Sequence, residues 1–316
     1  MSFNTNTTGA AGLSQEMQTY YDRLMLENMK PKLVHYEYGQ KRPYRANSGK
    51  TVQFRKWEPF GVAATPLTEG IIPDGQTLTG TSITATVAGY GGYVAVSDLL
   101  DLTAVDPVVS DSVDLMADQG ALTVDTLIRE KLHTGTNVLY AGGKTARASI
   151  AAADKLTVAD VRRAARLLKK NKALPFTRGG KSYYVAIVGP DTTYDLQSDT
   201  LWQDVSRYQD AEAIFSGEIG RLFGVIFVET TEAKIFADAG ASGAAVASTL
   251  VIGQNAYGVI DIENGSRPRA IIKTPEKSGT SDPLEQISTV GWKVDAFAVE
   301  ILQQGFMVRV EHGISA

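Results

Sequence analysis

The chain has 316 residues, of which 43% are hydrophobic, and it carries a formal net charge of −4 at pH 7. This length can bury a full hydrophobic core in two or three subdomains, and the mild charge excludes a protein that coats nucleic acid over its whole surface. The absence of cysteine excludes disulfide frameworks, zinc ribbons and thiol nucleophiles, and it suits a reducing cytoplasm.

The first residues, 1–13, are mostly Asn, Thr, Gly and Ala, and they lack the basic start and apolar core of a signal peptide. No run approaches the ~18 apolar residues of a membrane span, so we expect a soluble protein made in a cytoplasm. Ser14 is a suitable N-cap for a short helix that ends before Pro31. The apolar stripe of this helix needs a surface to lie on and consists of Met17, Tyr20, Tyr21, Leu24 and Met25.

Two stretches with period-two alternation, residues 51–57 and 82–88, are predicted strands. Residues 58–81 between them are rich in Pro, Gly and Thr and show no periodicity, which predicts a two-stranded ribbon with an extended tip. Because an isolated hairpin is marginally stable in water, the ribbon either folds back on its own domain or lies on another molecule. Its apolar face carries Val52, Phe54, Ile83, Ala85 and Val87. Glycines at its base are expected to act as hinges: Gly49, Gly89, Gly91 and Gly92.

The segment from Lys30 to Lys56 is basic, with Glu37 as its only acidic residue, and tyrosines are interleaved with the cations. Three interpretations stay open: pairing with an acidic protein surface, a merely solvated surface, or nucleic-acid binding.

A long amphipathic helix is predicted from Pro107, a favourable first helical position, to Leu132, shortly before Gly135. Such a helix would be roughly 39 Å long and would span a small domain. Its predicted inner stripe is Val109, Val113, Met116, Gly120, Val124, Leu127 and Lys131. The acidic residues assigned to its outer face are Asp98, Asp101, Asp106, Asp111, Asp114, Asp118, Asp125 and Glu130.

A Gly/Ala-rich loop at residues 140–153 marks a subdomain boundary. Beyond it, Thr157 and Asp160 resemble a capping box at the start of a helix. The inner face of that helix carries Val158, Val161, Ala165 and Leu168. Its outer face, interpreted as solvated, carries Arg162, Arg163, Arg166, Lys169 and Lys170. Predicted strands at residues 183–188, 220–230, 249–252 and 257–262, with a helix at 192–206, indicate a mixed α+β or α/β subdomain.

Residues 287–311 are again strand-like, with a turn at residues 303–305, and we expect these strands to pack against the long helix. Signals for catalysis are poor. The three histidines, His35, His133 and His312, lie far apart without metal-ligand spacing. Three Gly-Lys-Ser/Thr fragments lack the earlier glycine of a phosphate loop. We therefore expect no enzyme, no metal site and no cofactor.

Four segments, in this order, resemble the major capsid (coat) protein family of tailed bacteriophages. They are residues 13–43, residues 65–107, GEIGRLFGVIFVETTEA at residues 217–233, and residues 282–313. The resemblance implies the α+β shell fold shared by tailed phages and herpesviruses. In that scheme the chain divides into an N-terminal arm (1–47), an extended loop (48–93), a peripheral domain with the spine helix (94–150), an axial domain (151–288), and C-terminal strands that return to the peripheral domain (289–316).

The implied function is self-assembly, as pentamers and hexamers, into an icosahedral shell that encloses double-stranded DNA and contacts it weakly and non-specifically. The chain starts almost directly at the arm, so we expect a separate scaffolding protein, together with a portal and decoration proteins. Assembly is expected in the host bacterial cytoplasm, and the mature location is the virion. We expect the ribbon to lie on a neighbouring subunit, with contacts at Val52, Phe54, Arg55, Lys56, Ile83, Val87, Asp111, Asp114 and Asp118.

Two alternatives remain. An encapsulin-like compartment has the same fold but encloses enzymes, and its particles would contain no DNA. A soluble nucleotide-dependent enzyme would instead form a small oligomer with saturable ligand binding.

Overall fold

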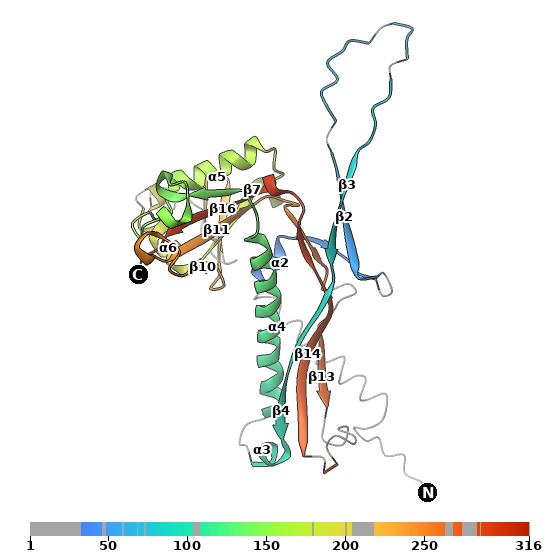
Figure 1. Cartoon of the computed structure of the whole chain (residues 1–316), viewed down its shortest axis with the longest axis vertical. Helices are drawn as coiled ribbons and strands as arrows, with labels where there is room; N and C mark the ends of the chain where they lie inside the picture. The colour runs from blue at the N-terminus through green and yellow to red at the C-terminus, as the bar shows by residue number, and fades with distance from the viewer. Residues whose placement is uncertain are drawn as a thin grey trace.

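The computed structural model describes residues 33–45, 49–58, 60–67, 69–72, 74–103, 108–178, 180–199, 201–203, 218–262, 268–273, 283–284 and 286–315. The predicted helix before Pro31, and also Ser48, Asp106 and Pro107, lie outside this part. Figure 1 shows a body of strands and helices, a limb built along one long helix, and a two-stranded ribbon that projects beyond both.

The long helix, α4, spans Val108–Leu132, which confirms the predicted spine. Apolar side chains at steps of three and four are buried along it, as its amphipathic pattern requires. They are Val113, Ala117, Ala121, Val124, Ile128 and Leu132. Asp111, Asp114 and Asp118 are exposed, as predicted. The assignment of Asp125 to the outer face is wrong, because this carboxylate is only 1% exposed.

Three strands complete the limb: β4 (Ala88–Ser97), β13 (Arg269–Lys273) and β14 (Ile287–Phe297), of which β4 and β14 contact α4. In the described residues they form an antiparallel sheet in the order β13-β14-β4. The Trp292 indole donates a hydrogen bond of 2.9 Å from Nε1 to Oε1 of Gln119 on the helix. A side chain at Gly92 would collide with the Gln119 amide, so glycine allows the sheet to approach α4 closely.

Three of the four glycines expected as hinges at the base of the ribbon lie instead within a strand of the limb sheet. Gly89, Gly91 and Gly92 all lie inside β4; Gly91 and Gly92 pair in register with β14, and Gly89 lies where that register shifts. A side chain at Gly91 would overlap the carbonyl oxygen of Trp292. Gly49 alone of the four has a left-handed backbone, with φ of 83° and open space around it.

The ribbon consists of β2 (Thr51–Trp57) and β3 (Gly80–Thr86), antiparallel with Phe54 opposite Ile83. This confirms the predicted hairpin and its long tip. At its root the ribbon meets a small sheet in the described residues, ordered β1-β12-β15. Its strands are β1 (Gln40–Arg42), β12 (Tyr257–Ile260) and β15 (Val299–Ile301).

The body is built on a sheet that has eight strands within the described residues, six of them in the order β5-β16-β11-β7-β9-β8. These are β5 (Val138–Tyr140), β16 (Met307–Gly313), β11 (Val246–Ile252), β7 (Lys181–Val188), β9 (Val225–Glu229) and β8 (Glu218–Leu222). The short β10 (Ile235–Phe236) pairs with β11, and β6 (Phe176–Arg178) pairs with β7.

Helices α5 (Val158–Lys170) and α6 (Pro190–Gln197) belong to the body, and α2 (Val34–Glu37) and α3 (Asp98–Thr103) lie by the limb. The capping box of Thr157 and Asp160 is present, and the predicted inner face of α5 is buried. One core cluster joins α5 to one face of the body sheet, and another joins the opposite face to α4.

Three boundaries differ from the prediction. β16 lies between β5 and β11 in the body sheet, so the end of the chain does not return to the limb as a whole. β12 and β13, expected in the axial domain, belong to the small sheet and the limb sheet. Residues 220–230 are not one strand, because Phe223 and Gly224 adopt positive φ and turn the chain back as a hairpin.

Candidate intersubunit surfaces and the polar junction behind them

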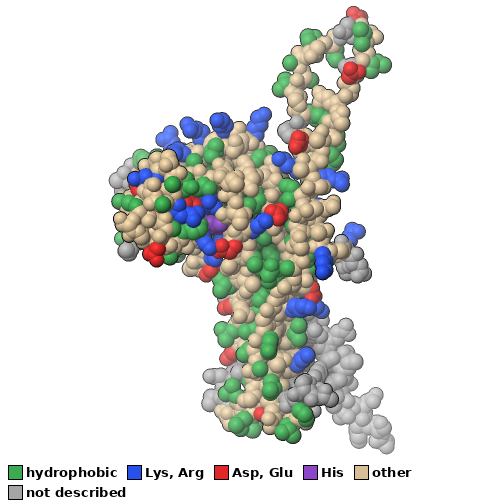
Figure 2. Space-filling view, in the orientation of Figure 1, with side chains coloured by type: hydrophobic (Ala, Val, Ile, Leu, Met, Phe, Trp, Pro, Cys, Tyr) green, Lys and Arg blue, Asp and Glu red, His purple; other side chains and the backbone are tan. Residues whose placement is uncertain are grey.

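The tip of the ribbon is the most conspicuous exposed apolar surface of the described chain. Figure 2 shows its hydrophobic side chains around an open loop that touches no other part of the molecule in this view. Val62 is 93% exposed and Ile72 is 92% exposed. Other large exposed apolar residues of the ribbon are Trp57, Phe60, Leu67, Ile71 and Leu78. Exposed apolar residues gathered on one projection mark a surface that binds a partner.

The root of the ribbon is covered by its own chain. Val52 and Phe54 are 7% and 3% exposed and pack with Ala85, Ile260 and Ala298. The Phe54 ring lies directly on the backbone of Gly258, where any side chain would overlap it. The prediction that Val52 and Phe54 contact a neighbouring subunit is therefore wrong. The apolar face of the ribbon root packs on the small sheet of its own chain instead.

The other predicted contact residues lie at or near the surface. Ile83 and Val87 are half-buried, with Val87 packed against the Phe54 cluster. Arg55 is exposed, and its guanidinium lies 5.7 Å from the centre of the Trp57 ring. Lys56 is half-buried beside it. A contact of these cations with the exposed aspartates of α4 in another subunit stays a prediction.

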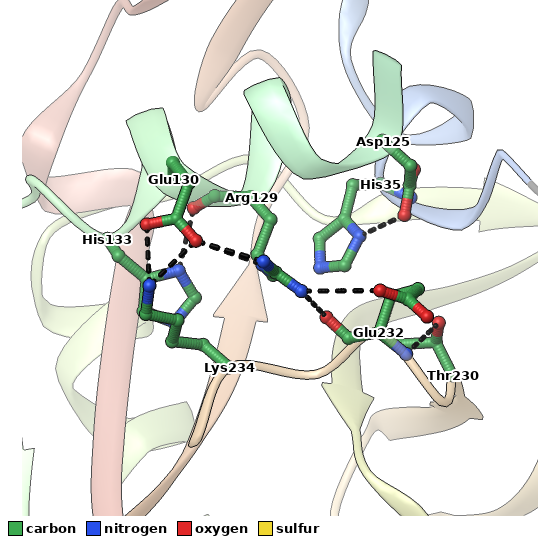
Figure 3. A network of polar contacts seen from close by, with 8 residues as sticks. All are labelled: His35, Asp125, Arg129, Glu130, His133, Thr230, Glu232 and Lys234. Carbon is green, nitrogen blue, oxygen red and sulfur yellow. Dashed lines mark hydrogen bonds and ion pairs between the residues drawn. The ribbon is translucent and has the colours of Figure 1, made fainter. Parts of the chain in front are cut away.

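A polar junction joins the end of α4 to the loop between β9 and β10 (Figure 3). Arg129 donates from Nη1 to the backbone oxygen of Glu232 at 2.7 Å, and the same nitrogen lies 3.5 Å from the Glu232 carboxylate. Lys234 donates to both carboxylate oxygens of Glu130 at 2.7 Å. Burial raises the pKa of Glu130, but hydrogen bonds from Lys234 and Arg129 outweigh it and hold the pKa below its usual range.

A second, fully buried contact ties the segment before the ribbon to α4. Asp125 accepts hydrogen bonds from the backbone N–H of His35 at 2.7 Å and from its Nδ1 at 2.6 Å. A carboxylate only accepts, so Nδ1 of His35 carries the hydrogen. The Tyr257 hydroxyl donates to the backbone oxygen of His35. His35 thus has a structural role, and its partner went unrecognised in the sequence because 90 residues separate the two.

His133 follows the last turn of α4 and belongs to the same junction (Figure 3). Its Nδ1 donates to the backbone oxygen of Arg129 at 2.7 Å, and its Nε2 accepts from the Ser248 hydroxyl at 3.0 Å. Burial lowers the pKa of His133 from 6.5 to about 4. Burial also lowers the pKa of His312, which contacts Thr249 inside the body sheet.

The unassembled chain is therefore expected to lose stability as the pH falls from 6.5 towards 4. In this window the unfolded chain binds protons at its ordinary histidine pKa and the folded chain resists them, so acidification favours unfolding. At about 1.4 kcal/mol per pKa unit, His133 contributes a loss of about 3 kcal/mol. Denaturant unfolding at pH 7, 5.5 and 4.5 measures this loss in the free energy of unfolding.

The control is His133→Asn, whose side-chain amide can keep the contact with the Arg129 carbonyl. Its stability should fall about 3 kcal/mol less than that of the unchanged chain over the same range. An identical fall in both proteins would contradict the assignment to His133.

A buried carboxylate in the body was also missed at the sequence level. Glu311 on β16 is fully buried and receives hydrogen bonds from Arg147 at 2.7 and 2.6 Å. Arg309 lies 2.9 Å from the same carboxylate. The alternation along residues 306–310 predicts the strand, but it does not identify Arg147, on the 140–153 loop, as the partner of Glu311.

Neither a metal centre nor a membrane segment emerges from the described ranges. No group of three or more His, Asp and Glu side chains in them is placed to hold a metal ion. No helix in them is both long and apolar enough to cross a membrane.

Comparison with known proteins gives one consistent result. Residues 125–266 match the model of the phage capsid protein family, while no curated protein matches the chain. The capsid of Ralstonia phage GP4 is similar, with a TM-score of 0.70 and 17% identity over 88% of each chain. The capsid of cyanophage Pam1 has a TM-score of 0.64 and 18% identity over 92% of each chain. The head of Helicobacter pylori bacteriophage KHP40 has a TM-score of 0.63 and 13% identity over 87% of this chain and 88% of that one. The chain therefore has the fold of tailed-phage capsid proteins, and its central segment, residues 125–266, matches the phage capsid protein family.

Proposed function

We infer that this chain is the structural subunit of an icosahedral capsid shell that encloses the double-stranded DNA genome of a phage. The observation that carries this function is the capsid fold along nearly the whole chain, together with the family match over residues 125–266. The role is structural. In a shell of identical chains, the same pair of surfaces forms every contact between neighbours, and this repetition favours closed symmetric assemblies.

The ribbon supports self-association and suggests where it occurs. Its root is buried within the chain, so the surface left for a neighbour is the tip from Phe60 to Leu78 with the exposed Trp57. The cations Arg55 and Lys56 would meet the exposed acidic face of a neighbouring α4, at Asp111, Asp114 and Asp118. Exposed ion pairs contribute about 0–1 kcal/mol each, so apolar burial of the tip would supply most of the affinity. Charge would set register and partner choice.

The assembly pathway follows the same scheme. Subunits would form pentamers and hexamers in the cytoplasm of the host bacterium, guided by a separate scaffolding protein. A portal and decoration proteins would complete the particle. Contact with packaged DNA would be weak and non-specific, consistent with the net charge of −4.

Sedimentation of the chain produced with its scaffolding protein, followed by nuclease treatment of phage particles, tests the function. We expect large closed particles, and DNA inside infectious particles that nuclease cannot reach. Particles that contain protein cargo and no DNA would indicate an encapsulin-like compartment. A small oligomer that never grows would contradict the proposed function.

A further inference from the structure

The exposed face of α5 is a row of cations. Within this 13-residue helix the exposed side chains, apart from Ala159, are Arg162, Arg163, Arg166, Lys169 and Lys170. The only acidic residue of the helix, Asp160, is 5% exposed, belongs to the capping box and pairs with Arg163 at 3.1 Å. Figure 2 shows the Lys and Arg side chains standing along the edge of the body where α5 lies.

Most cations elsewhere in the body and limb have a carboxylate partner. Lys131 pairs with Glu300, Lys234 with Glu130, and Lys155 with Asp195. By contrast, Arg166, Lys169 and Lys170 form no ion pair within the described residues. Arg162 lies over the ring of Phe223, 5.0 Å from its centre. Within the described residues the row therefore has one carboxylate partner, Asp160, which pairs with Arg163.

Helix stability does not account for the row. Cations favour the last turn of a helix through its dipole, which explains Lys169 and Lys170 and leaves three arginines in the middle. Like charges three and four residues apart destabilise a helix by about 0.2–0.5 kcal/mol per pair. Arg166 stands in that relation to Arg162, Arg163, Lys169 and Lys170. The sequence keeps an arrangement that costs local stability, which points to a bound anion.

The surroundings of the row favour phosphates over a protein partner. Two shallow hollows flank it, one lined by its cations with Phe223, the other by its cations with Leu139. The core of a protein interface is apolar and depleted in charge, whereas a phosphate backbone is held by Arg and Lys without an apolar core. Arg162 to Lys170 spans about 12 Å along the helix. The row is therefore long enough to contact more than one phosphate of a strand.

We propose that the exposed face of α5 binds the phosphate backbone of double-stranded DNA and faces the interior of the shell. This inference rests on the proposed capsid function. It also replaces the interpretation of the α5 cations as a merely solvated face. Among the helices that the structure describes, α5 alone carries such a row, and the whole chain has a net charge of −4. Such a site would bind DNA at one place in each subunit, and the rest of the inner surface of the shell would not attract DNA comparably.

The first test measures binding of the unassembled full chain to a fluorescent duplex by anisotropy across a range of salt concentrations. Each phosphate contact contributes about 0.9 to the slope of log affinity against log salt. The variant R166Q/K169Q/K170Q should therefore lose two to three units of slope and about a hundredfold or more in affinity at 0.1 M salt. The matched control K50Q/R55Q/K56Q removes the same charge from the ribbon root and should keep the slope.

Equal losses in both variants, or a larger loss in the control, would overturn the proposal. So would normal DNA binding by the α5 variant combined with failed assembly, which would make the row a contact between subunits.

The second test uses the absence of cysteine in the chain. A single Lys170→Cys should react with a bulky maleimide in opened shells and resist it in intact shells, because a cysteine on the interior face cannot be reached from outside. Rapid labelling of intact shells would overturn the interior position. If the unchanged chain forms no shells at all, the proposed capsid function fails, while the anisotropy measurement still decides whether α5 binds DNA.

Discussion

Phe54→Ala is expected to lower the free energy of unfolding of the unassembled chain by about 3–5 kcal/mol, as for other buried phenylalanines. The Phe54 ring fills the space above Gly258 and packs with Ile260 and Ala298. Arg42 lies 5.9 Å from its centre. Removing the ring leaves a cavity between the ribbon root and the small sheet. Denaturant unfolding followed by tryptophan fluorescence measures the change.

Phe60→Ala is the matched control, because it makes the same chemical change at a side chain that is 55% exposed on the tip. It should change the stability of the unassembled chain by less than about 0.5 kcal/mol and should slow or prevent shell assembly. Equal stability of the two variants would contradict the burial of the ribbon root. Normal assembly of Phe60→Ala would weaken the case for the tip as the contact surface.

Asp125→Ala is expected to cost about 3–5 kcal/mol, because it removes one partner of a buried polar pair. Two donors of His35, the backbone N–H and Nδ1, would lose their acceptor in a site that is 1% exposed. The segment before the ribbon would detach from α4, and the contact between Tyr257 and the His35 carbonyl would weaken with it. Hydrogen exchange of residues 33–38 should show faster opening in the variant, and unfolding measures the total loss.

Asp118→Ala provides the comparison on the same helix two turns earlier, where the aspartate is exposed. Surface substitutions of this kind usually change stability by less than about 0.5 kcal/mol. If Asp118→Ala and Asp125→Ala destabilised the chain equally, the buried pair would not be the cause.

The elements that depend on local pattern were predictable from the sequence. The ribbon strands follow from alternation, α4 from apolar residues at steps of three and four, and the start of α5 from Thr157 and Asp160. These signals work because the periods of strands and helices are fixed by backbone geometry. The resemblance to phage capsid proteins added the shell fold, and the fold comparison confirms that fold.

Pairing between distant segments was not predictable. Alternation identifies the apolar face of β2 but not the surface that covers it, so Phe54 was assigned to a neighbour when its own chain covers it. Gln40 pairs with Gly258, and β16 enters the body sheet beside β11, through contacts that no local period encodes. Asp125 was assigned to the exposed face because aspartate is polar. Its burial depends on a contact with His35, which lies 90 residues away in the sequence.

Electron microscopy of the purified native chain, alone and with its scaffolding protein, tests the central claim most directly. The capsid function predicts closed shells, or free pentamers and hexamers, whose subunits show the long limb and the projecting ribbon. A discrete dimer or tetramer that never assembles further, even with the scaffolding protein present, would contradict it.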